Sequence, residues 1–262
     1  MPRSSRFQKP LDARLPVALS IPKVIVDRTL AAYVGPGLTL EPHKMAVATL
    51  VVGLQETFEL DFFDDRADRS TISRMGLIPP DTLHHLRTSG PMLFLYLDPT
   101  RDDYRGLDLH DIAHRDAEKA NAVAHVLASD RVTIKTALHD VCALMDIDAR
   151  RSVDPRIARA QRLIDEHADE IVSIEQAADV AGLSVSRFQH VFRDTLGTTF
   201  RRYRIWKRMR LVALTLAEGG NLTDAAYAAG FSSSAHLSAA FKAMFGTAPS
   251  LLLQTGAKIV VV

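Results

Sequence analysis

The 262-residue sequence has little cysteine, little tryptophan and almost no net charge. Cys142 is the only cysteine, which excludes an internal disulfide and any zinc module built on several cysteines. No apolar run approaches the ~18 residues that a membrane-spanning helix needs. Residues 1–10 are polar and basic, unlike a secretory signal. We therefore expect a cytoplasmic protein with no membrane partner.

The net charge of +1 hides an uneven distribution of charged residues. Residues 1–150 contain 18 Lys and Arg against 21 Asp and Glu, whereas residues 151–262 contain 14 against 10. Six basic residues lie close together, at Arg201, Arg202, Arg204, Lys207, Arg208 and Arg210. Such a cluster is typical of a surface that binds a polyanion, although a solvated helix face is the ordinary alternative.

The first part of the chain, about residues 24–98, predicts a small β-structure. Short segments rich in Val, Ile, Leu, Phe and Thr are separated by turn signals such as Gly35-Pro36-Gly37. The predicted strands are 24–26, 45–54, 57–63, 71–78 and 92–97. Several short strands with Gly and Pro between them favour an antiparallel barrel or jelly roll.

Helical spacing of apolar residues replaces this pattern over 108–129 and 131–146. The apolar stripes of this helical pair need a partner, which can be the barrel, the other helix or a second subunit. A linker is expected at 150–153, and Asp154 followed by Pro155 predicts the start of a new helix. Everything beyond that point is predicted to be helical.

The last third of the chain contains one pattern twice, over residues 174–197 and 222–246. Each copy predicts a short helix, a turn at Gly182 or Gly230 and a second helix. Ser173 stands three residues before Gln176, and Asn221 stands three before Asp224, which is the spacing of a capping box. This is the helix-turn-helix layout, whose second helix can enter the DNA major groove. Residues 200–217 predict a connecting helix that fixes the spacing of the two units.

At this level of detail residues 155–253 resemble the DNA-binding domain of the AraC/XylS family of bacterial transcription regulators. The resemblance is carried by Gly230-Phe231-Ser232, His236-Leu237-Ser238, Phe241-Lys242, Phe245-Gly246 and Pro249. It implies base contacts from outward positions of the two second helices, namely Ser186, Gln189, His190, Ser234, Ala235, Ser238 and Ala239. Basic side chains are expected on the phosphates, namely Arg187, Arg193, Arg201, Arg202 and Lys242.

The two units are not equivalent in sequence. The family often has Arg where Ala239 stands. In this chain the second reading helix instead presents Ala and Ser side chains. Gln189 can pair with adenine, and His190 can bond to several base edges. We therefore expect the first unit to discriminate sequence more and the second to contribute more to positioning.

The family often fuses this domain to an effector-binding barrel with a dimerising helical pair, and residues 24–147 look like that arrangement. His43 and the 79–85 stretch with His84 resemble a weak cupin pattern, but the paired His-x-His of metal-dependent cupins is absent. We expect no metal, no cofactor and no catalytic residue, and we assign His43 and His84 to an effector pocket. The alternative is a metal-dependent cupin-type enzyme with an appended DNA-binding region.

The sequence thus predicts an α+β protein of two domains. Residues 1–150 form a cupin-like β-barrel, about 24–98, with a helical pair, about 108–147. Residues 151–262 form an all-α double helix-turn-helix domain. The expected function is sequence-specific transcription regulation under a small-molecule effector. The expected partners are double-stranded DNA, a second copy of the chain and, for an activator, RNA polymerase.

Overall fold

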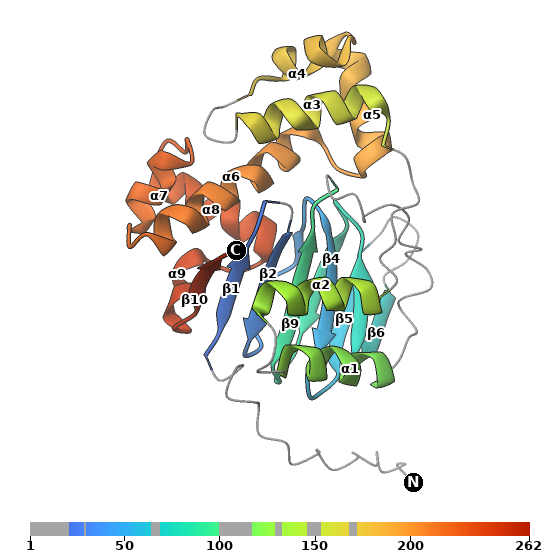
Figure 1. The fold of residues 1–262 in the computed structure, drawn as a ribbon, viewed down its shortest axis with the longest axis vertical. Helices are drawn as coiled ribbons and strands as arrows, with labels where there is room; N and C mark the ends of the chain where they lie inside the picture. Colours follow the sequence, from blue (N-terminus) through green and yellow to red (C-terminus); the bar gives the residue numbers. More distant parts are fainter. Residues whose placement is uncertain are drawn as a thin grey trace.

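The computed structural model describes residues 21–28, 30–63, 69–99, 117–128, 133–145, 153–167 and 172–262. It contains a β-sandwich with two helices on one face and a separate group of helices above and beside it (Figure 1). The α+β two-domain prediction is therefore confirmed. Residues 108–116 of the predicted helical pair and the linker up to residue 152 lie outside the described residues.

The sandwich consists of two sheets, one with the strand order β10-β1-β2-β9-β4-β7 and one with the order β3-β8-β5-β6. The strands are β1 (Lys23–Val26), β2 (Leu30–Gly35), β3 (His43–Lys44), β4 (Ala48–Gly53), β5 (Phe58–Phe62), β6 (Arg69–Ser73), β7 (Met75–Ile78), β8 (Leu83–Arg87), β9 (Met92–Leu97) and β10 (Lys258–Val261). All pairs are antiparallel except β1 with β10. Among the described strands the sheets stay open, so the architecture is closer to the jelly-roll alternative than to a closed barrel.

Strands β4 and β9 are almost wholly apolar because both of their faces are covered. Leu50 and Leu95 pair across the strands and point toward the helices, whereas Val51 and Phe94 point between the two sheets. Side chains alternate between the faces of a strand, so a strand with two covered faces needs a continuous apolar run. The continuous apolar run is therefore the signal that predicts a strand over 92–97.

The helical pair α1 (Ala117–Ala128) and α2 (Ile134–Leu144) packs on the outer face of the six-stranded sheet (Figure 1). The buried residues Val123, Leu127, Leu138 and Val141 share one core with that sheet. Of the three partners that the sequence left open, the sheet and the other helix therefore cover these stripes.

Seven helices form the second domain within its described residues, and their ends follow the predicted signals. They are α3 (Pro155–Glu166), α4 (Ile174–Ala181), α5 (Val185–Leu196), α6 (Phe200–Ala217), α7 (Leu222–Ala228), α8 (Ser234–Phe245) and α9 (Pro249–Gln254). Asp154 caps α3 by accepting a hydrogen bond from the Arg156 N–H at 2.9 Å. None of the described helices combines the length and the apolar character that crossing a bilayer demands.

The structure corrects three details of the predicted β-structure. Segments β2 and β8 are strands that the sequence did not reveal, since β2 contains two Ala and β8 contains two His, residues without strong strand preference. The segment 71–78 is divided between β6 and β7, which lie in different sheets.

The prediction that everything after Asp154 is helical is wrong at its end, because β10 is a strand. It joins the sheet of the first domain in parallel with β1, with Lys23 opposite Lys258 and Val26 opposite Val261. The pairing is a consequence of tertiary structure, since it brings together strands from opposite ends of the described chain (Figure 1).

Candidate nucleic-acid interface and effector cavity

The first helix-turn-helix unit is formed by α4 and α5. Ser173 and Gln176 make both hydrogen bonds of the predicted capping box, and Gly182 ends α4 in the left-handed region at φ 68°. Ser184 caps α5 and Gly197 ends it at φ 70°. These local signals set the angle between the two helices, and each confirms the sequence prediction.

An aromatic cluster holds α5 against the connecting helix α6. The ring of Phe188 lies 5.4 Å from that of Phe200, and the ring of Phe192 lies 5.5 Å from Phe200 and 5.6 Å from Tyr203. All four side chains are buried. Burial of one face in this way leaves the opposite face of α5 to solvent.

The exposed face of α5 carries the side chains predicted for the first unit. Ser186, Arg187, Gln189, His190 and Arg193 are all exposed. Four of them line one groove together with the start of α4 and the start of α6, namely Ser186, Gln189, His190 and Arg193, with Arg201 and Arg204. The structure therefore brings the predicted base-reading and phosphate-binding groups of this unit together.

The second unit repeats the local geometry in α7 and α8. Asn221 and Asp224 form a capping box, Gly230 has φ 71°, Ser233 caps α8 and Gly246 ends it at φ 72°. The N-terminal half of α8 presents the predicted side chains, with Ala235 and Ala239 exposed and Ser234 and Ser238 half-buried. Ser234, Ala235 and Ser238 line a second groove.

The C-terminal half of α8 faces the sandwich, which the sequence did not predict. The backbone N–H of Glu41 donates to the Gly246 carbonyl at 2.7 Å, and Lys242 Nζ lies 2.8 Å from the Glu41 carboxylate. Lys242 was expected on DNA phosphates, but in this arrangement of the domains it pairs with Glu41.

The basic cluster on α6 is also mostly engaged within the protein. Arg202 lies with Nε 3.2 Å from Asp81 Oδ1 and donates to the Lys44 carbonyl, so it faces the sandwich instead of DNA. Arg204 donates to the Val172 carbonyl at 3.0 Å, and Arg208 donates to the Ala229 carbonyl. Arg201 alone of the six is exposed. The expected polyanion-binding cluster is thus largely a set of helix-end and interdomain contacts.

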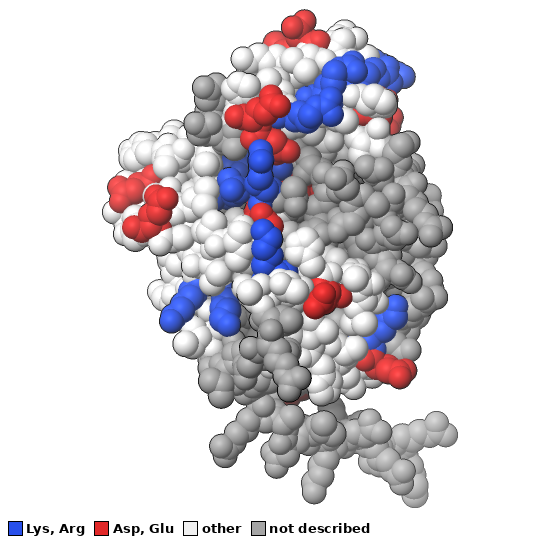
Figure 2. Space-filling view, viewed as in Figure 1, with Lys and Arg blue, Asp and Glu red and all other residues white. Residues whose placement is uncertain are grey.

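The molecular surface agrees with this distribution of charge. On the face shown in Figure 2, basic and acidic side chains alternate down a central band, and a group of basic side chains extends over the upper right. Interleaved charges reduce the long-range field of the central band.

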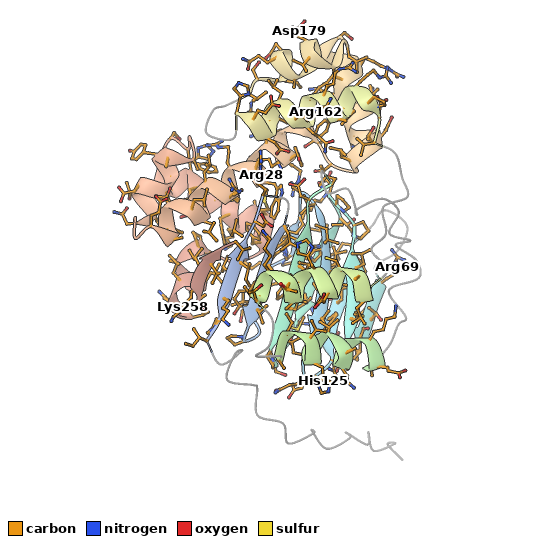
Figure 3. All side chains as sticks on the ribbon, viewed as in Figure 1. Arg28, Arg69, His125, Arg162, Asp179 and Lys258 are labelled. Carbon is orange, nitrogen blue, oxygen red and sulfur yellow. The ribbon has the colours of Figure 1, made fainter. Side chains whose placement is uncertain are left out.

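A cavity of about 130 Å³ lies where the sandwich meets α6, α8 and α9. Arg28 lines the cavity, and its label in Figure 3 marks the place where α6 meets the sandwich. The walls are mostly apolar, and aromatic rings contribute much of them, namely Tyr33, Phe94, Tyr96, Trp206, Phe241 and Phe245. A concave apolar site with a few polar groups is the usual form of a small-molecule site.

His43 and His84, which the sequence assigned to an effector pocket, both line this cavity. They are opposite each other in β3 and β8, with ring centroids 4.2 Å apart, and both are buried. Burial, together with the neighbouring His43, lowers the pKa of His84 to about 3, although the Thr82 carbonyl opposes the shift. Burial also lowers the pKa of His43. Both rings are therefore neutral at pH 7.

The cavity also has a buried ionic group that the sequence did not predict. Asp98 accepts hydrogen bonds from the Tyr203 hydroxyl at 3.1 Å and from Trp206 Nε1 at 2.9 Å. Lys207 Nζ lies 3.0 Å from Asp98 and 2.6 Å from Asp165. Burial alone would lower the pKa of Lys207, but the two carboxylates outweigh burial and raise it. The sequence signal for this group was Asp98, a single acidic residue directly after the apolar run 92–97.

Within the part of the chain that the structure describes, no three His, Cys, Asp or Glu side chains come together as metal ligands. Among the described residues, His43 and His84 therefore have no third metal-ligating side chain beside them. Their Nδ1 atoms are taken by backbone carbonyls, at 2.8 Å to Glu41 and 2.9 Å to Thr82.

The geometry defines a class: a double helix-turn-helix module joined to a sandwich, with an apolar cavity where the two meet. Residues 177–255 match the family described as "Helix-turn-helix domain". The chain is 27% identical over 146 residues to the HTH-type transcriptional activator RhaS of Enterobacter sp. (strain 638), which is 55% of this chain and 52% of RhaS. It is 30% identical over 153 residues to the transcriptional activator NphR of Rhodococcus sp, 57% of this chain and 45% of NphR. The chain thus spans about half the length of the curated relatives that it matches.

Solved structures with the same two-domain fold include ToxT of Vibrio cholerae. An apo form of ToxT that carries one substitution has a TM-score of 0.61 at 12% identity, and the match covers 87% of this chain and 97% of ToxT. A ToxT structure described as bound to an unsaturated fatty acid has a TM-score of 0.52 at 13% identity, covering 86% and 94%. Fold and sequence agree: residues 177–255 match a helix-turn-helix domain, the matched curated relatives are named transcription regulators or activators, and ToxT shares the two-domain fold.

Proposed function

We propose that this protein is a transcription regulator that binds double-stranded DNA sequence-specifically and is controlled by a small molecule. The observation that carries the proposal is the pair of solvent-facing reading helices, α5 and α8, joined by the single helix α6. A rigid connector fixes the separation of two reading helices, so both can address one face of a duplex. The match to regulators and activators supports the same function.

The side chains divide into two roles on DNA. Gln189, His190 and Ser186 are the base-reading groups of the first unit, and Ser234, Ala235, Ser238 and Ala239 are those of the second. Arg187, Arg193 and Arg201 are the phosphate contacts, since all three are exposed on or beside α5. Arg202 and Lys242 join them only if the contacts with Asp81 and Glu41 open.

A ligand in the cavity would couple to DNA binding through the helices that line it. Trp206 and Met209 belong to α6 and Phe245 belongs to α8, and all three line the cavity. A ligand in this position touches the helices that set the spacing of the reading units. A ligand shifts the population toward whichever domain arrangement it binds more tightly. A second copy of the chain and RNA polymerase complete the proposal as partners.

The test begins with DNA fragments selected by the protein from a random pool. In gel shifts at low salt, a reproducible motif with two half-sites about one helical turn apart is expected. Binding of every fragment with equal affinity would contradict sequence-specific recognition. The variant Gly230→Val, which disrupts only the second turn, should weaken binding without loss of the first half-site preference.

A further inference from the structure

The hydrogen-bonding state of the histidine pair restricts what the cavity can hold. Each Nδ1 lies within hydrogen-bond distance of a backbone carbonyl, of Glu41 for His43 and of Thr82 for His84. A carbonyl oxygen can only accept, so each Nδ1 must carry the hydrogen. In a neutral imidazole the other nitrogen then has a lone pair and no hydrogen. The tautomer is thus assigned from the network of partners.

Both Nε2 atoms are therefore acceptors. Neither has a hydrogen-bond partner among the described residues, while both rings line the cavity. Two other polar groups at the walls have partners, since the Tyr33 hydroxyl donates to the Pro36 carbonyl and Trp206 Nε1 donates to Asp98. Arg210 Nε, also at the wall, is buried without one among the described residues. An acceptor at a cavity wall can take a hydrogen bond from a ligand hydroxyl or N–H group.

The buried cation Lys207, which also lines the cavity, does not offer a free positive charge. Lys207 is held between Asp98 and Asp165, so two carboxylates surround one ammonium group. Arg28 and Arg210 also line the cavity, but neither makes a hydrogen bond or ion pair with His43 or His84 among the described contacts. The histidine end of the cavity is thus neutral and hydrogen-bond accepting.

Size and wall chemistry restrict the ligand further. A cavity of about 150 Å³ with apolar walls is known to hold benzene, and this one measures about 130 Å³. That volume is enough for a single six-membered ring. Aromatic walls at Phe94, Tyr96 and Trp206 favour a flat ring through offset or edge-to-face contacts.

Resting on the proposed function, we infer that the effector is a single-ring hydroxylated aromatic molecule whose O–H donates to Nε2 of one histidine of the His43–His84 pair. The hydroxyl is the group that distinguishes it from apolar molecules of the same size. A site built to bond a hydroxyl strongly disfavours the analogue that lacks it, because the buried acceptors are then left unpaired.

The probes are phenol and toluene, which have the same ring and differ in the hydroxyl. Trp206 is the only tryptophan and lines the cavity, so its fluorescence reports binding in the full chain. We expect phenol to bind at least tenfold more tightly than toluene. Equal affinity, or tighter binding of toluene, overturns the inference without any variant being needed.

Variants then locate the effect. His84→Phe and His43→Phe keep a ring at each position, and the variant that removes the accepting Nε2 should reduce the phenol preference to less than threefold. Thr49→Val removes another hydroxyl at the cavity wall and should leave the preference unchanged. A preference that survives both histidine substitutions would show that the hydroxyl is recognised elsewhere, which overturns the assignment.

DNA binding is measured on the same samples to separate this inference from the proposed function. Phenol preference without binding to any selected DNA contradicts the proposed function and leaves the ligand assignment standing. Sequence-specific DNA binding with no phenol preference leaves the function standing and overturns the ligand assignment.

Discussion

Lys207 and Asp98 form an ion pair of 3.0 Å between the middle of α6 and the end of strand β9. Both side chains are buried, and Tyr203 and Trp206 donate to the same carboxylate. One acidic residue of the sandwich therefore fixes three side chains of the connecting helix.

Removal of the carboxylate should destabilise the protein strongly. In Asp98→Ala, three buried donors lose a partner, and breaking a buried ion pair in this way costs about 3–5 kcal/mol. Urea unfolding checks this value. The control is Lys135→Ala, whose partner Asp27 lies near the surface at 3.4 Å, where about 0–1 kcal/mol is expected. Similar losses in both variants would contradict a special role for Asp98.

The DNA roles of neighbouring residues can be separated by their salt dependence. Gln189→Ala should relax preference at one base position by about 1–3 kcal/mol. Arg201→Ala should weaken binding to all sequences and reduce the salt slope by about 1, since one phosphate contact is lost.

Arg202 provides the control for this measurement, because it contacts Asp81 and Lys44 in the present arrangement. Arg202→Ala should leave the salt slope unchanged while it loosens the domain contact. A slope that falls equally in both arginine variants would show that Arg202 reaches DNA and that the domains rearrange on binding.

Acid should destabilise the fold through His84. Its pKa is lowered from 6.5 to about 3 in the folded protein, so the unfolded chain takes up the proton first as pH falls. Stability is fully retained above pH 6.5 and decreases between pH 6.5 and about 3. At pH 5 the loss is about 2 kcal/mol. His84→Phe should flatten the slope of stability against pH over this window.

Two glycines with nearly the same φ test how closely α8 approaches β3. A methyl group on Gly182 would meet open space, whereas a methyl group on Gly246 would lie 2.6 Å from the Glu41 carbonyl oxygen. Ala costs about 1–2 kcal/mol at either site from backbone strain. Gly246→Ala should cost about 1–3 kcal/mol more, by overpacking. Equal thermal-unfolding losses would mean that α8 can move away from the sandwich freely.

Deletion of residues 258–262 should expose the edge of β1. The Lys258 N–H donates to the Pro22 carbonyl and the Val262 N–H to the Val26 carbonyl, and each such bond contributes about 0.5–1.5 kcal/mol. Faster deuterium exchange is expected in peptides that contain β1, β2 and α9. Lys258→Ala retains the backbone bonds and should exchange as the unaltered chain does. Unchanged exchange after deletion would show that β10 contributes nothing to the sheet.

Local signals made the helix-turn-helix units predictable from the sequence. Ser173 with Gln176 and Asn221 with Asp224 act over three residues, and Gly182 acts through its own φ angle. The apolar runs of β4 and β9 were equally local. The two histidines of β3 and β8 line a cavity, and their assignment to an effector stays a prediction, whereas the aromatic walls from α6 and α8 were not foreseen.

The contact partners of the basic residues could not be predicted from local sequence signals. Arg202 meets Asp81, and Lys207 meets Asp98, across sequence separations that only the domain packing closes. A Lys or Arg on a helix has the same local pattern whether it faces solvent, a carboxylate or DNA. Strand β10 escaped prediction for a related reason, because four residues become a strand only beside an existing edge.

Strand β10 also has a consequence for synthesis of the chain. Its partner β1 is synthesised before the other described elements. Until β10 is synthesised, the backbone groups of β1 on that edge of the six-stranded sheet have no strand to pair with. An unpaired edge strand is a template for association with other chains. The nascent protein is therefore most exposed to misassembly in the interval before β10 leaves the ribosome, and chaperone demand should peak there.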